Sequence, residues 1–153
     1  MQIIGSDSPL FFKAAAVMRK YLPHIDFMPS CQIIYDENRY YGLITVNGST
    51  VNYDHVILDR TVCNPEMIFI VMTTLFSFGN IVNTFIDPNN KPAWKFVQGI
   101  GFVNTGILRQ EPQSLAIWSM TVTEWAANTL RQHFIKQTQK PEAHVDSHET
   151  KES

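Results

Sequence analysis

The chain has 153 residues, of which 44% are hydrophobic and 17% charged, and its formal net charge is −2. A chain of this length forms one domain and buries roughly 70% of its unfolded surface. It has no run of Lys or Arg, which argues against a nucleic-acid binder. The most apolar stretch, Met67 to Phe78, is too short to span a bilayer, and no signal peptide opens the chain. We therefore expect a cytoplasmic protein that does not bind membranes.

Cysteine and histidine spacing gives no metal motif. Cys31 and Cys63 are far apart and form no CxxC pair, which favours two reduced thiols and leaves a disulfide as the alternative. The histidines show no ligand spacing with each other or with the cysteines. We therefore predict no metal site.

The first half of the chain predicts one helix among four strands. "SDSP" can cap a helix and places a proline in its first turn, and "NGST" is a strong hairpin turn between alternating apolar segments. We expect strands at Met1–Ile4, Cys31–Tyr35, Arg39–Val46 and Val51–Asp59, and a helix over Leu10–Leu22.

In the second half, "NPE" opens a nearly all-apolar helix, and "DPNN" is a turn before another helix. We expect helices over Pro65–Phe78 and Lys91–Gly101, strands at Ile81–Ile86, Phe102–Gln110 and Ser114–Trp125 with "EPQ" as their turn, and a helical segment from Thr123 to Gln137. Residues 138–153 are polar and are predicted to be a tail outside a 1–137 domain. This order indicates an α+β domain with one mixed sheet and helices on both faces.

The segment "FIDPNNKPAWKFVQGIGF" has a regular spacing of Asn90, Ala93, Phe96 and the pair Gly101–Phe102. It is followed by "VNTGILRQ", a polar turn and the Met-containing "LAIWSMTVTEW". Together with the order of the elements, this spacing resembles the GNAT superfamily of acyl-CoA N-acyltransferases, and it looks closest to the small, divergent members found in bacteriophage genomes. The resemblance implies a single GNAT-like domain with an added C-terminal helix and polar tail.

The resemblance also implies a binding site. In this fold two neighbouring parallel strands splay apart, here Val51–Asp59 and Ile81–Ile86, and their unpaired backbone groups bind the pantetheine arm of acetyl-CoA. The residues that match the family's cofactor contacts are Asn90, with Asn89 as a near substitute, and Ala93.

Two features depart from the family pattern. The junction "DRTVCNPEMIF" has no glycine where the family has a glycine-rich loop for the pyrophosphate, and Pro65 removes one backbone amide. Arg60 could supply charge at that position. Val97 stands where the family often has a catalytic tyrosine.

The resemblance implies a proton acceptor on the splayed strand, where Asp54, His55 and Asp59 are the candidates. We predict His55 as the base, because its unperturbed pKa is near 6.5, and Tyr53 as the acid. A structural role for His55 is the alternative.

The sequence therefore supports two functions. One is a catalytically reduced GNAT-fold protein that acts as a binding or assembly component, for example of a phage virion, with a protein partner or a second copy contacting residues 138–153. The other is an active acetyl-CoA-dependent N-acetyltransferase that modifies a primary amine.

Overall fold

The structure is a computed structural model that describes residues 1–28, 30–110 and 113–139. In these ranges the chain forms a sheet of seven strands with helices between them. The strands are β1 (Gln2–Gly5), β2 (Gln32–Asp36), β3 (Tyr40–Asn47), β4 (Thr50–Ile57), β5 (Ile81–Ile86), β6 (Val103–Gln110) and β7 (Gln113–Thr121). The helices are α1 (Pro9–Tyr21), the short 3₁₀ helix η1 (Arg60–Val62), α2 (Pro65–Phe76), α3 (Lys91–Ile100) and α4 (Val122–Ala126).

The sheet is mixed, with spatial order β1-β2-β3-β4-β5-β7-β6. Only β4 and β5 pair in parallel; the other neighbouring strands of the described sheet are antiparallel. The connection between β4 and β5 is therefore a crossover, and α2 provides it. The predicted α+β class and the predicted order of elements are confirmed.

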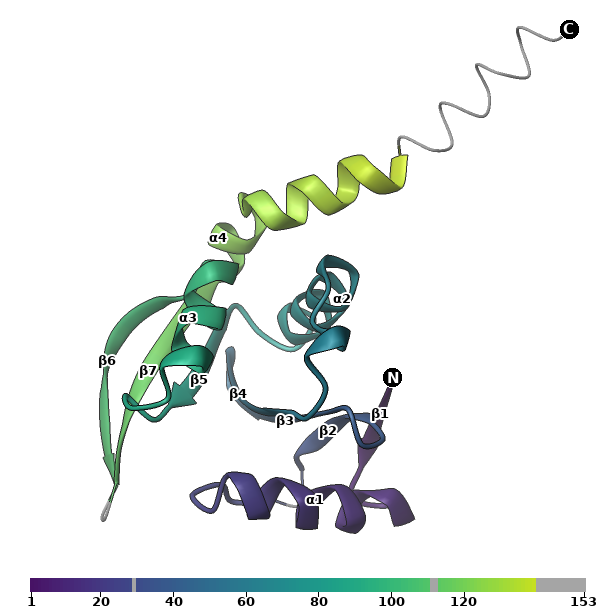
Figure 1. The fold of residues 1–153 in the computed structure, drawn as a ribbon, viewed down its shortest axis with the longest axis vertical. Coiled ribbons are helices and arrows are strands. Elements are labelled where there is room, and N and C mark those ends of the chain that lie inside the picture. Colours follow the sequence, from purple (N-terminus) through teal and green to yellow (C-terminus); the bar gives the residue numbers. More distant parts are fainter. Residues whose placement is uncertain (29, 111–112, 140–153) are drawn as a thin grey trace, which may run out of the picture.

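The helices cover both faces of the sheet (Figure 1). On one face, α1 buries Phe11, Ala14 and Met18 against the inward side chains of β2 and β3. On the other face, α2 and α3 enclose a larger core with β4 and β5. The alternation of strand residues between the two cores, such as Tyr53 on one side and Val56 on the other, follows from the two-residue period of a strand.

Three helices begin by the same local device. Ser8, Asn64 and Asn90 each accept a hydrogen bond from a backbone amide of the first turn, at 3.3, 2.9 and 3.3 Å. A proline follows each cap within the first two helical positions, where no intrahelical amide donor is needed. These caps explain why the predicted starts of α1, α2 and α3 are close to the observed ones.

The C-terminal segment differs from the prediction. The last strand ends at Thr121, not Trp125, because Thr121 and Glu124 form a capping box that starts α4. The predicted single helix is broken at Asn128, whose Oδ1 accepts from the amides of Leu130 and Arg131, and a second helix runs over 129–139. Figure 1 shows that this helix leads away from the sheet. The predicted "EPQ" turn and most of the predicted tail lie outside the described residues.

None of the helices in the described ranges has both the length and the hydropathy needed to cross a lipid bilayer.

Candidate functional site

The sheet opens between β4 and β5. The two strands pair from Thr50 with Ile81 to Tyr53 with Thr84, and there the pairing stops. The other edge of β4 stays paired with β3 as far as Ile57. The β5-facing edge of β4 therefore has no strand partner in the described sheet over Asp54–Ile57. The predicted splay is confirmed, and it leaves backbone donors and acceptors that a ligand can use.

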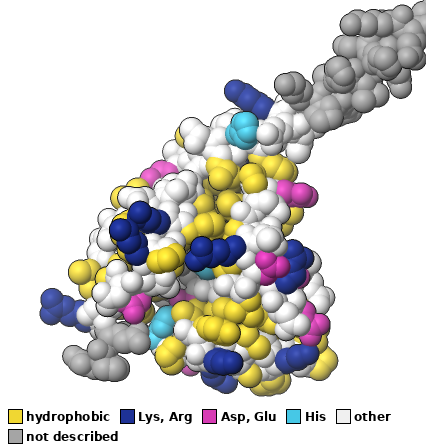
Figure 2. Space-filling view, viewed as in Figure 1, with side chains coloured by type: hydrophobic (Ala, Val, Ile, Leu, Met, Phe, Trp, Pro, Cys, Tyr) yellow, Lys and Arg dark blue, Asp and Glu magenta, His cyan; other side chains and the backbone are white. Residues whose placement is uncertain are grey.

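Two pockets meet at this opening. The first, here called the α3 pocket, has a volume of about 460 Å³. It is lined by residues of β4, of α3, and of the segment over residues 59–66 that contains η1, here called the η1 junction. The second, the loop pocket, has a volume of about 180 Å³ and is bounded by the loop after α1. Both are lined by His55, Asn90 and Ala93. Figure 2 shows a hollow on this face, with hydrophobic and Lys or Arg side chains beside it.

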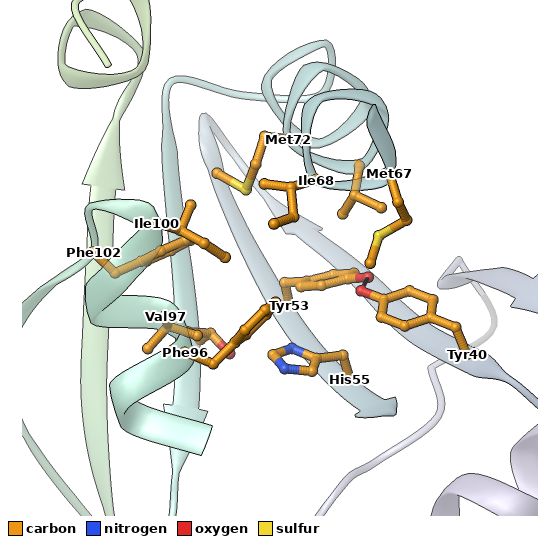
Figure 3. A pocket seen from close by; sticks show the side chains of 12 residues that line it. Tyr40, Tyr53, His55, Met67, Ile68, Met72, Phe96, Val97, Ile100 and Phe102 are labelled. Atoms are coloured by element: carbon orange, nitrogen blue, oxygen red, sulfur yellow. Dashed lines mark hydrogen bonds between the residues drawn. The ribbon is translucent and has the colours of Figure 1, made fainter. Parts of the chain in front are cut away.

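His55 lies at the centre of the opening, but its ring is packed among aromatic rings (Figure 3). The ring centroids of Tyr40, Tyr53 and Phe96 lie 6.2, 5.7 and 6.3 Å from that of His55. The Nδ1 atom is buried and has no hydrogen-bond partner among the described residues. Burial disfavours the charged form and lowers the pKa of His55 to about 4, although neighbouring Asp54 acts in the opposite direction. His55 is therefore neutral at pH 7 and a weak proton acceptor.

Tyr53 points away from the two pockets. Its hydroxyl is hydrogen-bonded to that of Tyr40, and both rings are buried beneath α2 (Figure 3). Burial raises the pKa of Tyr53 well above its ordinary value. The side chain lines a small inner cavity of about 30 Å³ and is not among the described residues that line the α3 pocket or the loop pocket. The acid role of Tyr53 stays a prediction, and its geometry gives that role little support.

The start of α3 forms one wall of the opening. Asn90 is exposed, lines both pockets, and uses its Oδ1 to cap the helix, which leaves its amide nitrogen for a ligand. Ala93 is half-buried one turn later and lines both pockets as well. Asn89 is exposed, and its backbone amide donates to Asp87 Oδ1 at 2.9 Å. Asn89 does not line either pocket. Val97 is buried in the core.

The η1 junction forms the other wall of the α3 pocket, and Arg60 projects from it as an exposed side chain. Most backbone amides of this junction already donate to acceptors within the chain. The acceptors are Asp59 Oδ1 for Thr61, Asp59 O for Val62, Arg60 O for Cys63, Val62 O for Asn64, and Asn64 Oδ1 for Met67. Pro65 has no amide to offer.

A cofactor of the coenzyme A type therefore fits this site in one part only. The unpaired edge of β4 and the α3 pocket suit an uncharged, amide-bearing arm. The junction does not suit a pyrophosphate, because most of its amides are occupied and Pro65 has none, so no run of successive amides is left to hold the phosphates.

Asp54 and His24 form a pair on the opposite side of the sheet from Tyr53. His24 Nε2 lies 3.6 Å from Asp54 Oδ1, and the two side chains are only 15% and 14% exposed. His24 lines the loop pocket, and both line an adjoining pocket of about 240 Å³, here called the Asp54 pocket. Asp54 was one of the strand candidates in the sequence, but His24 was not connected with it. The two are thirty positions apart, and no spacing rule links a post-helix loop to a strand.

The surroundings of this pair are acidic. Asp87 lines the loop pocket, and Asp26 lines the Asp54 pocket together with Asp54. Neither pocket has a Lys or Arg among the described residues that line it. The described part of the chain also contains no group of three or more His, Cys, Asp or Glu that could hold a metal ion. This side of the opening therefore suits a cationic ligand.

Comparison with known proteins identifies the fold. No protein-family model matches the chain, and no curated protein matches its sequence. Among solved structures, a chimera of spermidine N-acetyltransferase SpeG from Vibrio cholerae and hSSAT has a TM-score of 0.61 at 10% identity, covering 82% of this chain and 99% of that one. Aminoglycoside acetyltransferase AAC(6')-Ib, solved with coenzyme A, has a TM-score of 0.51 at 12% identity, covering 64% and 69%.

A third structure, described as an acetyltransferase from T. thermophilus, has a TM-score of 0.53 at 13% identity, covering 70% of this chain and 64% of that one. At these identities the likeness concerns the fold alone. The chain therefore has the α+β fold of the GNAT acetyltransferases, as its sequence pattern predicted.

Proposed function

We propose that this protein is an N-acyltransferase that takes an acyl group from a pantetheine thioester and transfers it to a primary amine. The observation that supports this most strongly is the end of β4–β5 pairing at Tyr53 and Thr84, which leaves the edge of Asp54–Ile57 facing two connected pockets. A catalytically silent module has no need of such an opening, because unpaired backbone groups are costly when they are left without partners.

The two sides of the opening suit the two substrates. On the side of the α3 pocket, the β4 edge can pair with the amides of the pantetheine arm, and Asn90 and Ala93 border its path. On the other side, the carboxylates of Asp26, Asp54 and Asp87 attract an ammonium group. Two structures of AAC(6')-Ib, which has a similar fold, were solved with coenzyme A, and this supports the proposal of a thioester donor.

An amine that binds as an ammonium loses two protons on the way to the amide, one to solvent before it attacks and one as its nitrogen bonds to the acyl carbon. A bound thioester supplies the activated acyl carbon. We propose that Asp54, with His24 beside it, accepts the second proton as the amine nitrogen bonds to that carbon. The carbon–sulfur bond breaks at the same time, and the thiolate leaves and takes up a proton from solvent. His55 would then be a structural residue of the opening, because its Nδ1 is enclosed and its pKa is low.

Asp54→Asn keeps the shape of the side chain but removes its charge. We expect kcat for acyl transfer to fall about a hundredfold or more, in the range typical of general bases, while KM for the thioester changes little. His24→Gln is expected to lower kcat as well. The assay is thiol release from acetyl-CoA with a panel of primary amines, read against a reaction without amine, since Cys31 and Cys63 are free thiols.

A matched control is Asp36→Asn, since Asp36 ends β2 and lies 3.8 Å from Arg39, outside the described lining of these pockets. It should keep the kcat of the unaltered protein. Equal kcat values for Asp54→Asn and the unaltered protein would contradict the base assignment. No thiol release with any amine would contradict the proposed function itself.

The assembly role remains an alternative proposal. It depends on the departures at the η1 junction and on residues 138–153, of which 140–153 lie outside the described residues. The comparisons give no support to a phage or virion origin. A folded protein without thioester binding, together with a partner lost on deletion of residues 138–153, would favour this alternative.

A further inference from the structure

We infer that this protein recognises the acyl-pantetheine arm of its donor and not the nucleotide, so that a nucleotide-free pantetheine thioester serves as well as acetyl-CoA. The inference rests on the proposed function, because it names the donor class of the same opening. The two walls of the α3 pocket differ in their free backbone groups. The β4 edge has no strand partner and can pair with a ligand, whereas most amides of the η1 junction already have acceptors within the chain.

The closed wall follows from the hydrogen bonds of the junction. A pyrophosphate is held by several backbone amides that point at it from a loop and the following helix. Here Asp59 and Asn64 act as caps and take up such amides with their own side-chain oxygens, at 2.9 Å to both Thr61 N and Met67 N. To free them, the nucleotide would have to displace two caps, each of which stabilises the helix it starts.

The charge of the junction points the same way. A coenzyme A nucleotide carries a diphosphate and a further phosphate, so its binding site should be positive. Residues 59–66 contain Asp59, Arg60 and Glu66, and Arg39 lies beside Asp59, so the junction has two positive and two negative groups and is not a positive site. The hydrogen bonds from Thr61 to Asp59 lower the pKa of that carboxyl, and Arg39 lies 3.6 Å from it, so Asp59 is ionised at pH 7. Arg60 is the only Lys or Arg among the described residues lining the α3 pocket.

The open wall suits the arm. Ile57, Ala93 and Phe96 give the α3 pocket an apolar lining, and the edge of β4 runs beside it. The pantetheine arm is uncharged and carries two amide groups, which can pair with a strand edge as a further strand would. Its recognition therefore needs nothing from the η1 junction.

The same arm occurs on free pantetheine thioesters and as the prosthetic group of holo-acyl carrier proteins. Both sources present it without an adenine nucleotide. Because we infer recognition of the arm alone, we expect the protein to use both sources as acyl donors.

The test is isothermal titration of the full chain with acetyl-CoA, S-acetyl-pantetheine and adenosine 3',5'-bisphosphate. We expect the affinities for the two thioesters to agree within about tenfold, and the bisphosphate not to compete with S-acetyl-pantetheine. Acetyl-CoA binding more than tenfold tighter, or competition by the bisphosphate, would overturn the inference and leave the proposed function standing. If neither thioester binds at millimolar concentration, both fail.

Two further experiments test the same inference. Arg60→Ala is expected to change the affinities for acetyl-CoA and S-acetyl-pantetheine by the same factor. A loss confined to acetyl-CoA would reveal a phosphate contact and overturn the inference. In turnover, S-acetyl-pantetheine and an acetylated holo-acyl carrier protein should both donate. Donation by the carrier protein alone would place recognition on the protein surface and overturn it too.

Discussion

Ala93→Trp is expected to weaken thioester binding about a hundredfold, equivalent to about 3 kcal/mol of binding free energy, without unfolding the protein. Ala93 lines both pockets of the opening and is half-buried on the face of α3 that borders them. An indole at this position would fill the path between β4 and α3, because Ala93 is one of the three residues that line both pockets. The measurement is titration with acetyl-CoA, together with the melting temperature.

The matched control is Gln98→Trp, on the exposed side of the same helix. It adds the same indole outside the lining of the pockets, and should leave the affinity unchanged. Ala93→Val adds less bulk and should give an intermediate loss, which guards against misfolding of the larger variant. Undiminished binding by a folded Ala93→Trp protein would show that the thioester does not use this opening.

His55→Phe is expected to remove a pH dependence of stability of about 3 kcal/mol. The pKa of His55 is lowered from 6.5 to about 4 in the folded protein, so between these values the unfolded chain binds a proton that the folded chain does not. Stability from this site is therefore complete above pH 6.5 and falls as the pH drops toward 4. Phenylalanine cannot be protonated, and it fits a site bounded by Tyr40, Tyr53 and Phe96.

The measurement is denaturant unfolding at pH 7 and pH 4 for the unaltered protein and the variant. His133→Gln is the control, because His133 is exposed on the helix over 129–139. It should show the same loss of stability on acidification as the unaltered protein. An equal loss in His55→Phe would mean that the His55 ring is not held neutral by burial.

Local signals explain which parts of the fold could be predicted from the sequence. The Ser or Asn caps followed by proline fix the starts of α1, α2 and α3, and "NGST" fixes the turn between β3 and β4. The break at Asn128 was missed because a mid-helix Asn is not a strong stop in itself. It became one because its Nδ2 donates to Ile100 O at 2.6 Å, a contact that only the folded chain makes.

The candidate site likewise combines features that the sequence predicts with features that depend on the folded structure. The opening lies between β4 and β5, as the resemblance carried by "NNKPAWKFVQGIGF" predicted, and Asn90 and Ala93 line it. Their contact with a cofactor stays a prediction. Residue type favoured His55 as the base, but burial decides its proton affinity, and burial is a property of the tertiary structure. The approach of His24 to Asp54 likewise depends on how the loop after α1 packs against β4.

Hydrogen exchange along β4 tests most directly whether the donor binds on the strand edge. Amides of Thr50–Tyr53 and of β3 already lie in paired strands, whereas Asp54–Ile57 has one edge without a strand partner. Acetyl-CoA, which carries the arm whether or not the nucleotide is recognised, is added at saturating concentration. We predict slower exchange of one or more amides within Asp54–Ile57, with Gln32–Asp36 unchanged. Bound acetyl-CoA without any protection in Asp54–Ile57 would contradict the account.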